Sequence, residues 1–323
     1  MHTKFIGIDI SKQTFDVAFC KEEKWKHYEF SNNLKGFNSL LDLIDKEDWV
    51  IMEASGPYYF PLASFLYSKK VQLVVENPLV IKRYSQMKLY RAKTDKKDAR
   101  TIAEYGMLSE LKCWVPDEKH IIAIKQLHTA IEGLQKQLHQ SCRQLEAFRS
   151  SGVLDKFLEK EMKKVISFLE SKILKIEKKQ EELAKEHFTP SLEKLTSIPG
   201  IGNKTAIMLI VITNDFKKFE NYKQLVAYVG FSPRIYQSGT SIKGKGHICK
   251  MGKAQIRKLL YICSWSVKRW NNTCKEMHER LVKKGKPERV IKIAIANKLL
   301  KQAFAIAKGD KFYEKNYQPN TCF

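Results

Sequence analysis

The first 115 residues alternate between short apolar runs and amphipathic segments, which predicts strands and helices in a defined order. Continuous and alternating apolar runs predict strands over residues 4–10, 14–20, 24–30, 49–53 and 71–75. Spacings of three and four predict helices over residues 36–44, 58–67, 78–87 and 95–108. Tight links join the first three strands, so we expect antiparallel hairpins followed by alternating helices and strands.

This order of elements is typical of an RNase H-like (RuvC-like) α/β domain. We therefore expect such a domain over residues 1–115. In that arrangement the first strand lies in the middle of the sheet, and the ends of the first and fourth strands lie near the last helix of the domain.

Four carboxylates occupy positions from which they can converge. Asp9 lies inside an apolar strand, where an unpaired charge is costly. Glu53 ends the fourth strand, and Asp95 and Asp98 share one face of the closing helix, whose N-cap is expected at Thr94. Carboxylate oxygens are the ligands that Mg²⁺ prefers, so the four predict a Mg²⁺ site at which Mn²⁺ can substitute. The alternatives are a paired core carboxylate, a strand-end surface acid and ordinary first-turn helix acids.

Residues 116–188 carry a longer pattern. Pro116 and the two acids that follow it are expected to form the first turn of a long helix. Its apolar positions repeat at alternating spacings of three and four as far as Phe148, which is a heptad seam. A second helix with similar spacing follows the turn at Gly152. We predict an antiparallel coiled-coil hairpin for dimerisation or spacing; a helical hairpin packed on its own domain is the alternative.

A basic, mostly helical domain is expected over residues 189–323, after a boundary near Pro190. It opens with Pro199-Gly200-Ile201-Gly202 between two helices, which either offers backbone N–H groups to a phosphate or forms a structural turn. Residues 228–253 are rich in Gly and Lys, which predicts a loop or ribbon that closes on phosphates. The five glycines of residues 230–252 suggest close backbone approach to a ligand. Further helices are predicted over residues 255–269, 275–282 and 289–307.

The net charge of +23 points to a polyanionic partner. Residues 1–188 carry 32 Lys and Arg against 27 Asp and Glu, whereas residues 189–323 carry 26 against 8. The C-terminal domain is therefore the expected nucleic-acid surface, although charge that serves solubility alone is an alternative. The candidates for contact with nucleic acid are Lys93, Lys204, Arg234, Lys243, Lys245, Lys250, Lys253 and Arg257.

Cysteine spacing and hydropathy exclude other classes. The seven cysteines are scattered, without a Cys-x-x-Cys pair or a His at zinc spacing, so we expect reduced thiols in the cytoplasm. No apolar run approaches ~20 residues and the N-terminus lacks a signal-peptide pattern. We therefore expect neither a membrane span nor secretion.

Five short motifs occur in order across residues 4–260, each weak alone but specific together. They are Gly7-Ile8-Asp9-Ile10-Ser11-Lys12, Met52-Glu53-Ala54-Ser55-Gly56, Lys93-Thr94-Asp95-Lys96-Lys97-Asp98-Ala99, Ile198-Pro199-Gly200-Ile201-Gly202, and Gly230-Phe231-Ser232-Pro233 leading to Gln237-Ser238-Gly239. With them the chain resembles the DEDD-type transposases of the IS one-ten insertion-sequence family and their relatives, the Piv-like invertases. The family's usual Leu-Ala or Leu-Thr before the proline is Phe231-Ser232 here, which we expect to be neutral.

The resemblance implies that the four acids bind Mg²⁺ and that Ser238, in a C-terminal transposase domain, is the nucleophile. It also implies double-stranded donor and target DNA, guidance by a structured RNA encoded beside the transposase, and a homo-oligomer, either a dimer or a tetramer. We accordingly expect a prokaryotic enzyme of the cytoplasm, associated with the nucleoid. Without the resemblance, Ser232, Thr240 and Ser241 offer the same hydroxyl chemistry as Ser238.

A serine nucleophile and a carboxylate-bound metal make a coherent recombinase. A phosphoserine would conserve the phosphodiester energy for rejoining, and the metal would stabilise the leaving oxygen. Ser238 lies some 140 residues beyond Asp98, so the site would form by domain closure or between subunits. Three other classes stay open: a Mg²⁺-dependent junction-resolving nuclease that uses water, a sugar-kinase or actin-like ATPase, and a non-catalytic nucleic-acid-binding protein. The ATPase would need a second Asp-x-Gly strand and a late Gly-rich motif, and neither occurs.

Overall fold

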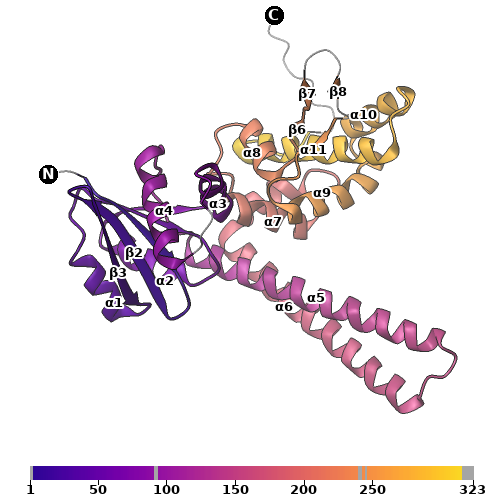
Figure 1. The fold of residues 1–323 in the computed structure, drawn as a ribbon. Helices are drawn as coiled ribbons and strands as arrows, with labels where there is room; N and C mark the ends of the chain where they lie inside the picture. The colour runs from indigo at the N-terminus through magenta and orange to yellow at the C-terminus, as the bar shows by residue number, and fades with distance from the viewer. Residues whose placement is uncertain (1–2, 91–93, 239–241, 244–245, 315–323) are drawn as a thin grey trace, which may run out of the picture. The chain divides into compact units, whose positions relative to one another are not determined.

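The structure is a computed structural model that describes residues 3–90, 94–238, 242–243 and 246–314 (Figure 1). The chain divides into two units, Met1–Pro116 and Asp117–Phe323. The fold is mixed α/β, because the first unit is built on a five-stranded sheet and the second is mostly helical. The division expected near residue 188 falls inside the second unit, where it stays a prediction.

A mixed five-stranded sheet with the order β3-β2-β1-β4-β5 forms the centre of the first unit. Its strands, close to the predicted runs, are β1 (Phe5–Ile10), β2 (Thr14–Lys21), β3 (Lys24–Ser31), β4 (Trp49–Glu53) and β5 (Gln72–Glu76). β1 pairs antiparallel with β2 and parallel with β4. The central position predicted for the strand of Asp9 is therefore confirmed.

Helices cover both faces of this sheet. They are α1 (Leu34–Leu41), α2 (Tyr59–Ser68), α3 (Pro78–Met87) and α4 (Asp95–Leu108). The first two pack on the face that carries Ile6 and Ile8, whereas α3 and α4 pack on the face of Ile51. Because β1 is buried on both faces, its apolar run is continuous rather than alternating, and Asp9 is the one charge inside it.

The second unit begins with two long helices, α5 (Lys119–Ser150) and α6 (Lys156–Thr196), which pack side by side (Figure 1). The start predicted at Pro116 is wrong by three residues, and no acid lies in the first turn of α5. Asp117 instead lies before the helix, where it binds two lysines. The helix α6 is interrupted at Phe188, whose φ of −134° is not helical, two residues before Pro190. Proline disrupts the preceding turn, so the boundary expected here coincides with a kink.

The remaining helices pack with the base of α5 and α6 around one apolar core. They are α7 (Asn203–Thr213), α8 (Tyr222–Val229), α9 (Ala254–Ser266), the 3-10 helix η1 (Val267–Arg269), α10 (Asn272–Lys283) and α11 (Glu288–Lys308). Between α8 and α9 the chain forms a ribbon, as predicted. Its two-residue strands are β6 (Pro233–Arg234), β7 (Gln237–Ser238), β8 (Ile242–Lys243) and β9 (His247–Ile248), with β6 paired to β9 and β7 to β8.

The described part of the chain was expected to contain no membrane-spanning helix and only reduced cysteines. None of its helices combines the length and the apolar character that crossing a membrane requires. The cysteines of the described residues, among which Cys322 is not included, are all free thiols.

Candidate active site

A row of carboxylates crosses the sheet where β1 ends. Asp9 of β1 lies opposite Asp16 of β2, which in turn lies opposite Glu29 of β3. Residues that lie opposite one another on paired strands project from the same face of a sheet. On the β2 side of β1, two acids therefore project from the same face of the sheet as Asp9.

The row continues on the other side of β1. The last registered pair of β1 and β4 is Ile8 with Met52, so Asp9 and Glu53 follow as the next residues of their strands. Glu53 lies opposite Glu76 of β5. Five strands thus each contribute one acid to the same face, with Asp9 and Glu53 as the inner pair.

Two of the outer acids of the row, Asp16 and Glu76, are held by local partners. Asp16 Oδ1 lies 2.6 Å from Nε2 of His27. Glu76 accepts hydrogen bonds from the hydroxyl of Tyr105 at 3.0 Å and from the backbone N–H of Asn77 at 2.8 Å. These contacts give Asp16 and Glu76 a structural role beside the inner pair.

The helix α4 lies directly against the sheet on this face. A Cβ added to Gly7 would lie 2.1 Å from the carbonyl oxygen of Ala99 and 2.3 Å from the nitrogen of Ala103. Further along α4, a Cβ on Gly106 would lie 2.7 Å from Cδ1 of Ile51. Small residues on both elements therefore allow this close approach, and they place the first turn of α4 beside the end of β1.

Asp95 and Asp98 lie in that first turn. Thr94 is the N-cap, as predicted, and its side chain accepts a hydrogen bond from the backbone N–H of Lys97 at 3.3 Å. Asp95 is exposed and Asp98 is half-buried. The two acids therefore face the end of β1 from the helix above it.

The pKa of Asp9 shows that these groups influence one another. Burial raises it from 3.8 to about 6, with further upward contributions from the negative charges of Asp98, Asp95 and Glu53 and, last, Asp16. The structure thus brings the four predicted acids into one electrostatic cluster, although their catalytic role stays a prediction.

The donor chemistry of this cluster fits a hard divalent cation. Carboxylates that repel one another are stabilised by a bound dication, and Mg²⁺ combines a few carboxylates with water. Within the described ranges, no three His, Cys, Asp or Glu side chains already stand close enough together to hold an ion.

The cluster predicts an unusual dependence of stability on pH. Because the folded state raises the pKa of Asp9, the protonated carboxyl favours folding, and this contribution is lost as the pH rises from about 4 to about 6. We expect Asp9→Asn, which cannot ionise, to be more stable than the native chain at about pH 7 in EDTA. The gain is at most about 3 kcal/mol for a shift of about two units, and less because the carboxyl is partly exposed.

Urea unfolding at about pH 4 and about pH 7 measures this difference in the free energy of unfolding. The gain should disappear at the lower pH, where the native carboxyl is protonated too. The same gain at both values would contradict a repelling cluster.

Ser238 lies in the ribbon of the second unit, at the end of β7 and opposite Ile242 of β8. The acids belong to the first unit, so the meeting of the serine with them stays a prediction. Among the other candidate hydroxyls, Ser232 precedes β6 and its carbonyl accepts a hydrogen bond from the N–H of Cys249 at 2.8 Å. Thr240 and Ser241 lie outside the described residues.

The base of the ribbon explains two of its glycines. Gly230 and Gly252 have φ values of +83° and +127°. A Cβ on Gly230 would lie 2.4 Å from the carbonyl oxygen of Met251, and one on Gly252 would lie 2.1 Å from that of Tyr228. At both positions the glycine admits the neighbouring protein backbone. The expectation that the glycines of this ribbon also allow close approach to a ligand stays a prediction.

The predicted nucleic-acid contacts have different surroundings. Arg234 is exposed on β6, and Lys250 is exposed with a left-handed φ of +61°. Lys204 forms an ion pair with Glu177 at 2.7 Å. Their role in binding stays a prediction.

One of the other candidates, Arg257, makes a contact within the fold, and its role in binding also stays a prediction. Arg257 donates through Nη1 to the carbonyl of Val229 at 2.6 Å, which fixes the base of the ribbon. Lys253, the N-cap of α9, has an exposed side chain whose Nζ lies over the ring of Tyr228 at 5.4 Å. Lys93 and Lys245 lie outside the described residues, and of Lys243 only the backbone, in β8, is described.

Comparisons with known proteins decide the class. A family model of DEDD transposases, described as Transposase, matches residues 6–151, and another, described as Transposase IS116/IS110/IS902 family, matches residues 192–279. The pilin gene-inverting protein of Moraxella lacunata is 30% identical over 326 residues, which cover 98% of this chain and 99% of that protein. The chain belongs to the IS110 family of transposases.

Further relatives agree with this assignment. The pilin gene-inverting protein of Moraxella bovis is also 30% identical over 98% of the chain and 99% of its own length. The transposase of insertion sequence element IS1111A from Coxiella burnetii is 24% identical over 80% of the chain and 76% of its own length. The resemblance carried by the five motifs is therefore confirmed. This IS110-family transposase is an enzyme that acts on DNA.

Sequence reasoning missed Asp16 of this transposase. The N–H of Ser11 donates to the carbonyl of Thr14 at 2.9 Å, and this turn sets the register that places Asp16 opposite Asp9. The tight link between the first two predicted strands was the signal that could have found it.

Proposed function

We propose that this IS110-family transposase cleaves and rejoins DNA through a phosphoserine at Ser238, with Mg²⁺ held by Asp9, Glu53, Asp95 and Asp98. The observation that supports the metal site is the raised pKa of Asp9, which follows from its burial and from the three other carboxylates. Carboxylates that repel one another at the end of a central strand are suited to a cation that binds with the substrate. The first unit is accordingly an RNase H-like (RuvC-like) catalytic domain.

Each acid would have a defined part. Asp9, on the central strand, and Glu53, on the neighbouring strand, would be the ligands from the sheet. Asp95 and Asp98 approach from α4, whose distance from the sheet is set by the contact at Gly7. When bound, Mg²⁺, or Mn²⁺ in its place, polarises the scissile phosphate and stabilises the leaving oxygen.

The serine would conserve the energy of the broken bond. Its Oγ attacks phosphorus as the bond from phosphorus to a sugar oxygen breaks, and the hydroxyl proton passes to a base while the sugar oxygen leaves. A sugar hydroxyl of a second strand then attacks the phosphoserine, which restores Ser238 and closes the new phosphodiester. No nucleotide cofactor is required for this exchange.

The acids and Ser238 are far apart in the sequence, so the active site would have to be assembled from two separate parts of the protein. A composite site would form by closure of the units or between subunits of a homo-dimer or tetramer. The packed helices α5 and α6 support an antiparallel coiled-coil role in that oligomer. Double-stranded donor and target DNA and a structured guide RNA would be the partners, in the cytoplasm at the nucleoid.

A covalent protein–DNA adduct tests the proposal. The native chain with Mg²⁺ should form an adduct that survives denaturant, and Ser238→Ala should lose strand transfer by at least ~10³-fold, together with the adduct. Ser232→Ala is the matched control and should retain both. EDTA should stop cleavage in every variant.

Two results would contradict this scheme. An adduct still formed by Ser238→Ala would move the nucleophile to another hydroxyl. Cleavage by Ser238→Ala without any adduct would favour the junction-resolving nuclease, in which water attacks under the same four acids.

A further inference from the structure

A cavity of about 250 Å³ lies in the second unit between α5, α7, α8 and the start of α9. Here it is termed the lysine pocket. Its polar lining residues are Lys125, His128, Thr129, Tyr228, Lys253 and Gln255. A water molecule occupies about 30 Å³ in the liquid, so the pocket has room for a group larger than a single water.

Positive charge exceeds negative charge around this pocket. Asp117 binds Lys125 through Oδ2 at 2.5 Å and Lys218 through Oδ1 at 2.9 Å. Burial lowers the pKa of Lys253, and the charges of Lys125 and Lys218 lower it further. Three ammonium groups therefore lie within reach of one another, and the carboxylate of Asp117 is bound between two of them. A second carboxylate, that of Glu132, accepts a hydrogen bond from Gln255, another residue of the pocket lining.

The same walls can donate hydrogen bonds. Nζ of Lys253 lies 5.4 Å from the centre of the Tyr228 ring. Burial, and after it the charge of Asp117, raises the pKa of Tyr228 to about 12, so its hydroxyl keeps its proton at neutral pH. Nε2 of His128 is buried and makes no hydrogen bond among the described residues, and Oε1 of Glu132 lies 3.8 Å from it. Lys253 is also the N-cap of α9, and the amide groups of that helix start add partial positive charge.

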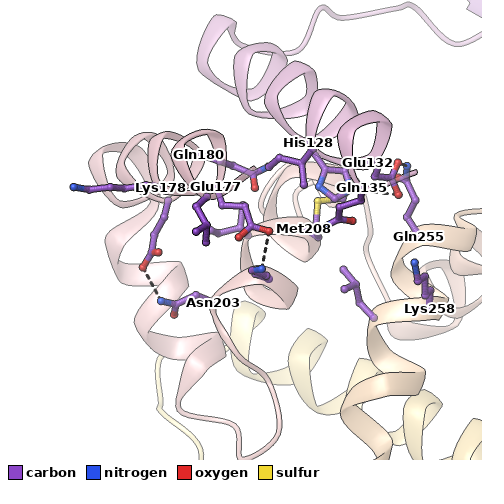
Figure 2. Close-up of a pocket in the computed structure, with 16 residues that line it drawn as sticks. His128, Glu132, Gln135, Glu177, Lys178, Gln180, Asn203, Met208, Gln255 and Lys258 are labelled. Carbon is purple, nitrogen blue, oxygen red and sulfur yellow. Dashed lines mark hydrogen bonds and ion pairs between the residues drawn. The ribbon is translucent and has the colours of Figure 1, made fainter. Parts of the chain in front are cut away.

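A neighbouring cavity shows the contrast (Figure 2). It measures about 300 Å³ and shares His128, Met208 and Gln255 with the lysine pocket. Each of its three acids has a partner: Glu177 forms an ion pair with Lys204 at 2.7 Å, Glu181 accepts a hydrogen bond from Asn203 at 2.8 Å, and Glu132 accepts one from Gln255. Balanced charge leaves that cavity with no preference for an ion of either sign.

We propose that the lysine pocket binds a phosphate group, with Lys125 and Lys253 as the direct cationic contacts and Lys218 as their electrostatic support. A phosphate accepts several hydrogen bonds, and its negative charge would complement the three ammonium groups that share the one carboxylate of Asp117. For this enzyme the backbone of its DNA substrate is the nearest source. That assignment rests on the proposed function only for the identity of the polymer, and it does not depend on the serine chemistry.

Salt-dependent DNA binding tests the pocket. Each phosphate contact that is lost lowers the slope of log Kobs against log salt by about one. We expect Lys253→Gln and Lys125→Gln each to lower the slope by about one and to weaken duplex binding roughly tenfold at about 0.1 M salt. Lys253→Arg, which keeps the charge, should restore the slope.

Lys301→Gln is the matched control. Lys301 lies over the ring of Tyr222 at 5.0 Å, so the change removes one lysine charge and one cation–π contact outside the pocket. Its slope should equal that of the native chain. Thermal melting of each full-length variant checks that it is folded.

Inorganic phosphate forms the second arm. If the ligand is a free phosphate, the anion should raise the melting temperature of the native chain above that in chloride of equal ionic strength, Lys253→Gln should lose this gain, and the DNA slope should not change. A lowered slope assigns the phosphate to the DNA backbone. Equal slopes and equal phosphate effects in Lys253→Gln, Lys125→Gln and Lys301→Gln would overturn the proposal.

These measurements are made in EDTA, without cleavage, so they are independent of the adduct test. If Ser238→Ala still forms the adduct and Lys253→Gln lowers the salt slope, the serine chemistry is refuted and the phosphate site in the pocket is supported. If Ser238→Ala loses the adduct and Lys253→Gln leaves the salt slope unchanged, only the phosphate site in the pocket is refuted.

Discussion

Replacing Asp9 by Asn is expected to lower the rate of DNA strand cleavage by at least about 10³-fold, since a metal bound at the scissile phosphate supplies several kcal/mol of transition-state stabilisation. The amide removes a negative charge from the centre of the acid cluster and would therefore weaken binding of the proposed cation. DNA affinity should stay within about twofold, because phosphate contacts by Lys and Arg supply most of it. Single-turnover cleavage of labelled DNA and a parallel binding titration measure the two effects.

This variant separates catalysis from folding. Asp9→Asn is also expected to be the more stable protein at neutral pH, so a loss of cleavage cannot result from unfolding. A variant that is inactive and more stable would show that the buried carboxylate is retained for function at a cost in stability.

Asp16→Asn is the matched control. Asp16 lies opposite Asp9 in the same row, but its carboxylate contacts His27 at 2.6 Å. We expect it to retain cleavage within about tenfold, because a residue outside the metal's direct ligands has the smaller effect. Equal losses in the two variants would show that the row acts as one charged surface rather than through a metal held by Asp9.

Gly7→Ala is expected to have the largest effect on stability. The new methyl group would lie 2.1 Å from a backbone oxygen and 2.3 Å from a backbone nitrogen of α4, neither of which can move without the helix. We expect the first unit to lose about 3 kcal/mol or more of its free energy of unfolding, at or beyond the upper end for overpacking. Urea unfolding measures the loss.

The same substitution should also weaken the acid cluster. If α4 moves off the sheet, Asp95 and Asp98 move away from Asp9, and the pKa of Asp9 should fall toward its ordinary value. Titration by NMR of the folded fraction would detect this change. An unchanged pKa in a folded Gly7→Ala protein would show that the packing of α4 does not position its two acids.

Gly133→Ala provides the control for a glycine in a helix. Gly133 is exposed on α5, and a Cβ there would meet nothing within 4 Å. Alanine is the better helix former, so this variant should be stabilised by about 0.5–1 kcal/mol. Opposite signs for the two Gly→Ala changes would show that the cost at Gly7 arises from its contact with α4.

The sequence by itself determined the elements of the first unit and the identity of its four candidate acids. The buried strands carry continuous apolar runs, and Thr94 caps α4 as its position before two acids predicts. These features depend on neighbours within a few residues, so periodicity and capping rules reveal them. The motifs around Asp9 and Glu53 likewise identified the family.

Only the tertiary structure decided which distant groups act on one another. The register of β1 and β2 added Asp16 to the row, and the contact between Gly7 and α4 set the position of the helical acids. Asp117 and Lys218 are 101 residues apart in the chain yet form an ion pair beside Lys253. Such a contact depends on how whole helices pack, so the periodicity of either segment does not indicate it. The lysine pocket could therefore not be predicted from the sequence.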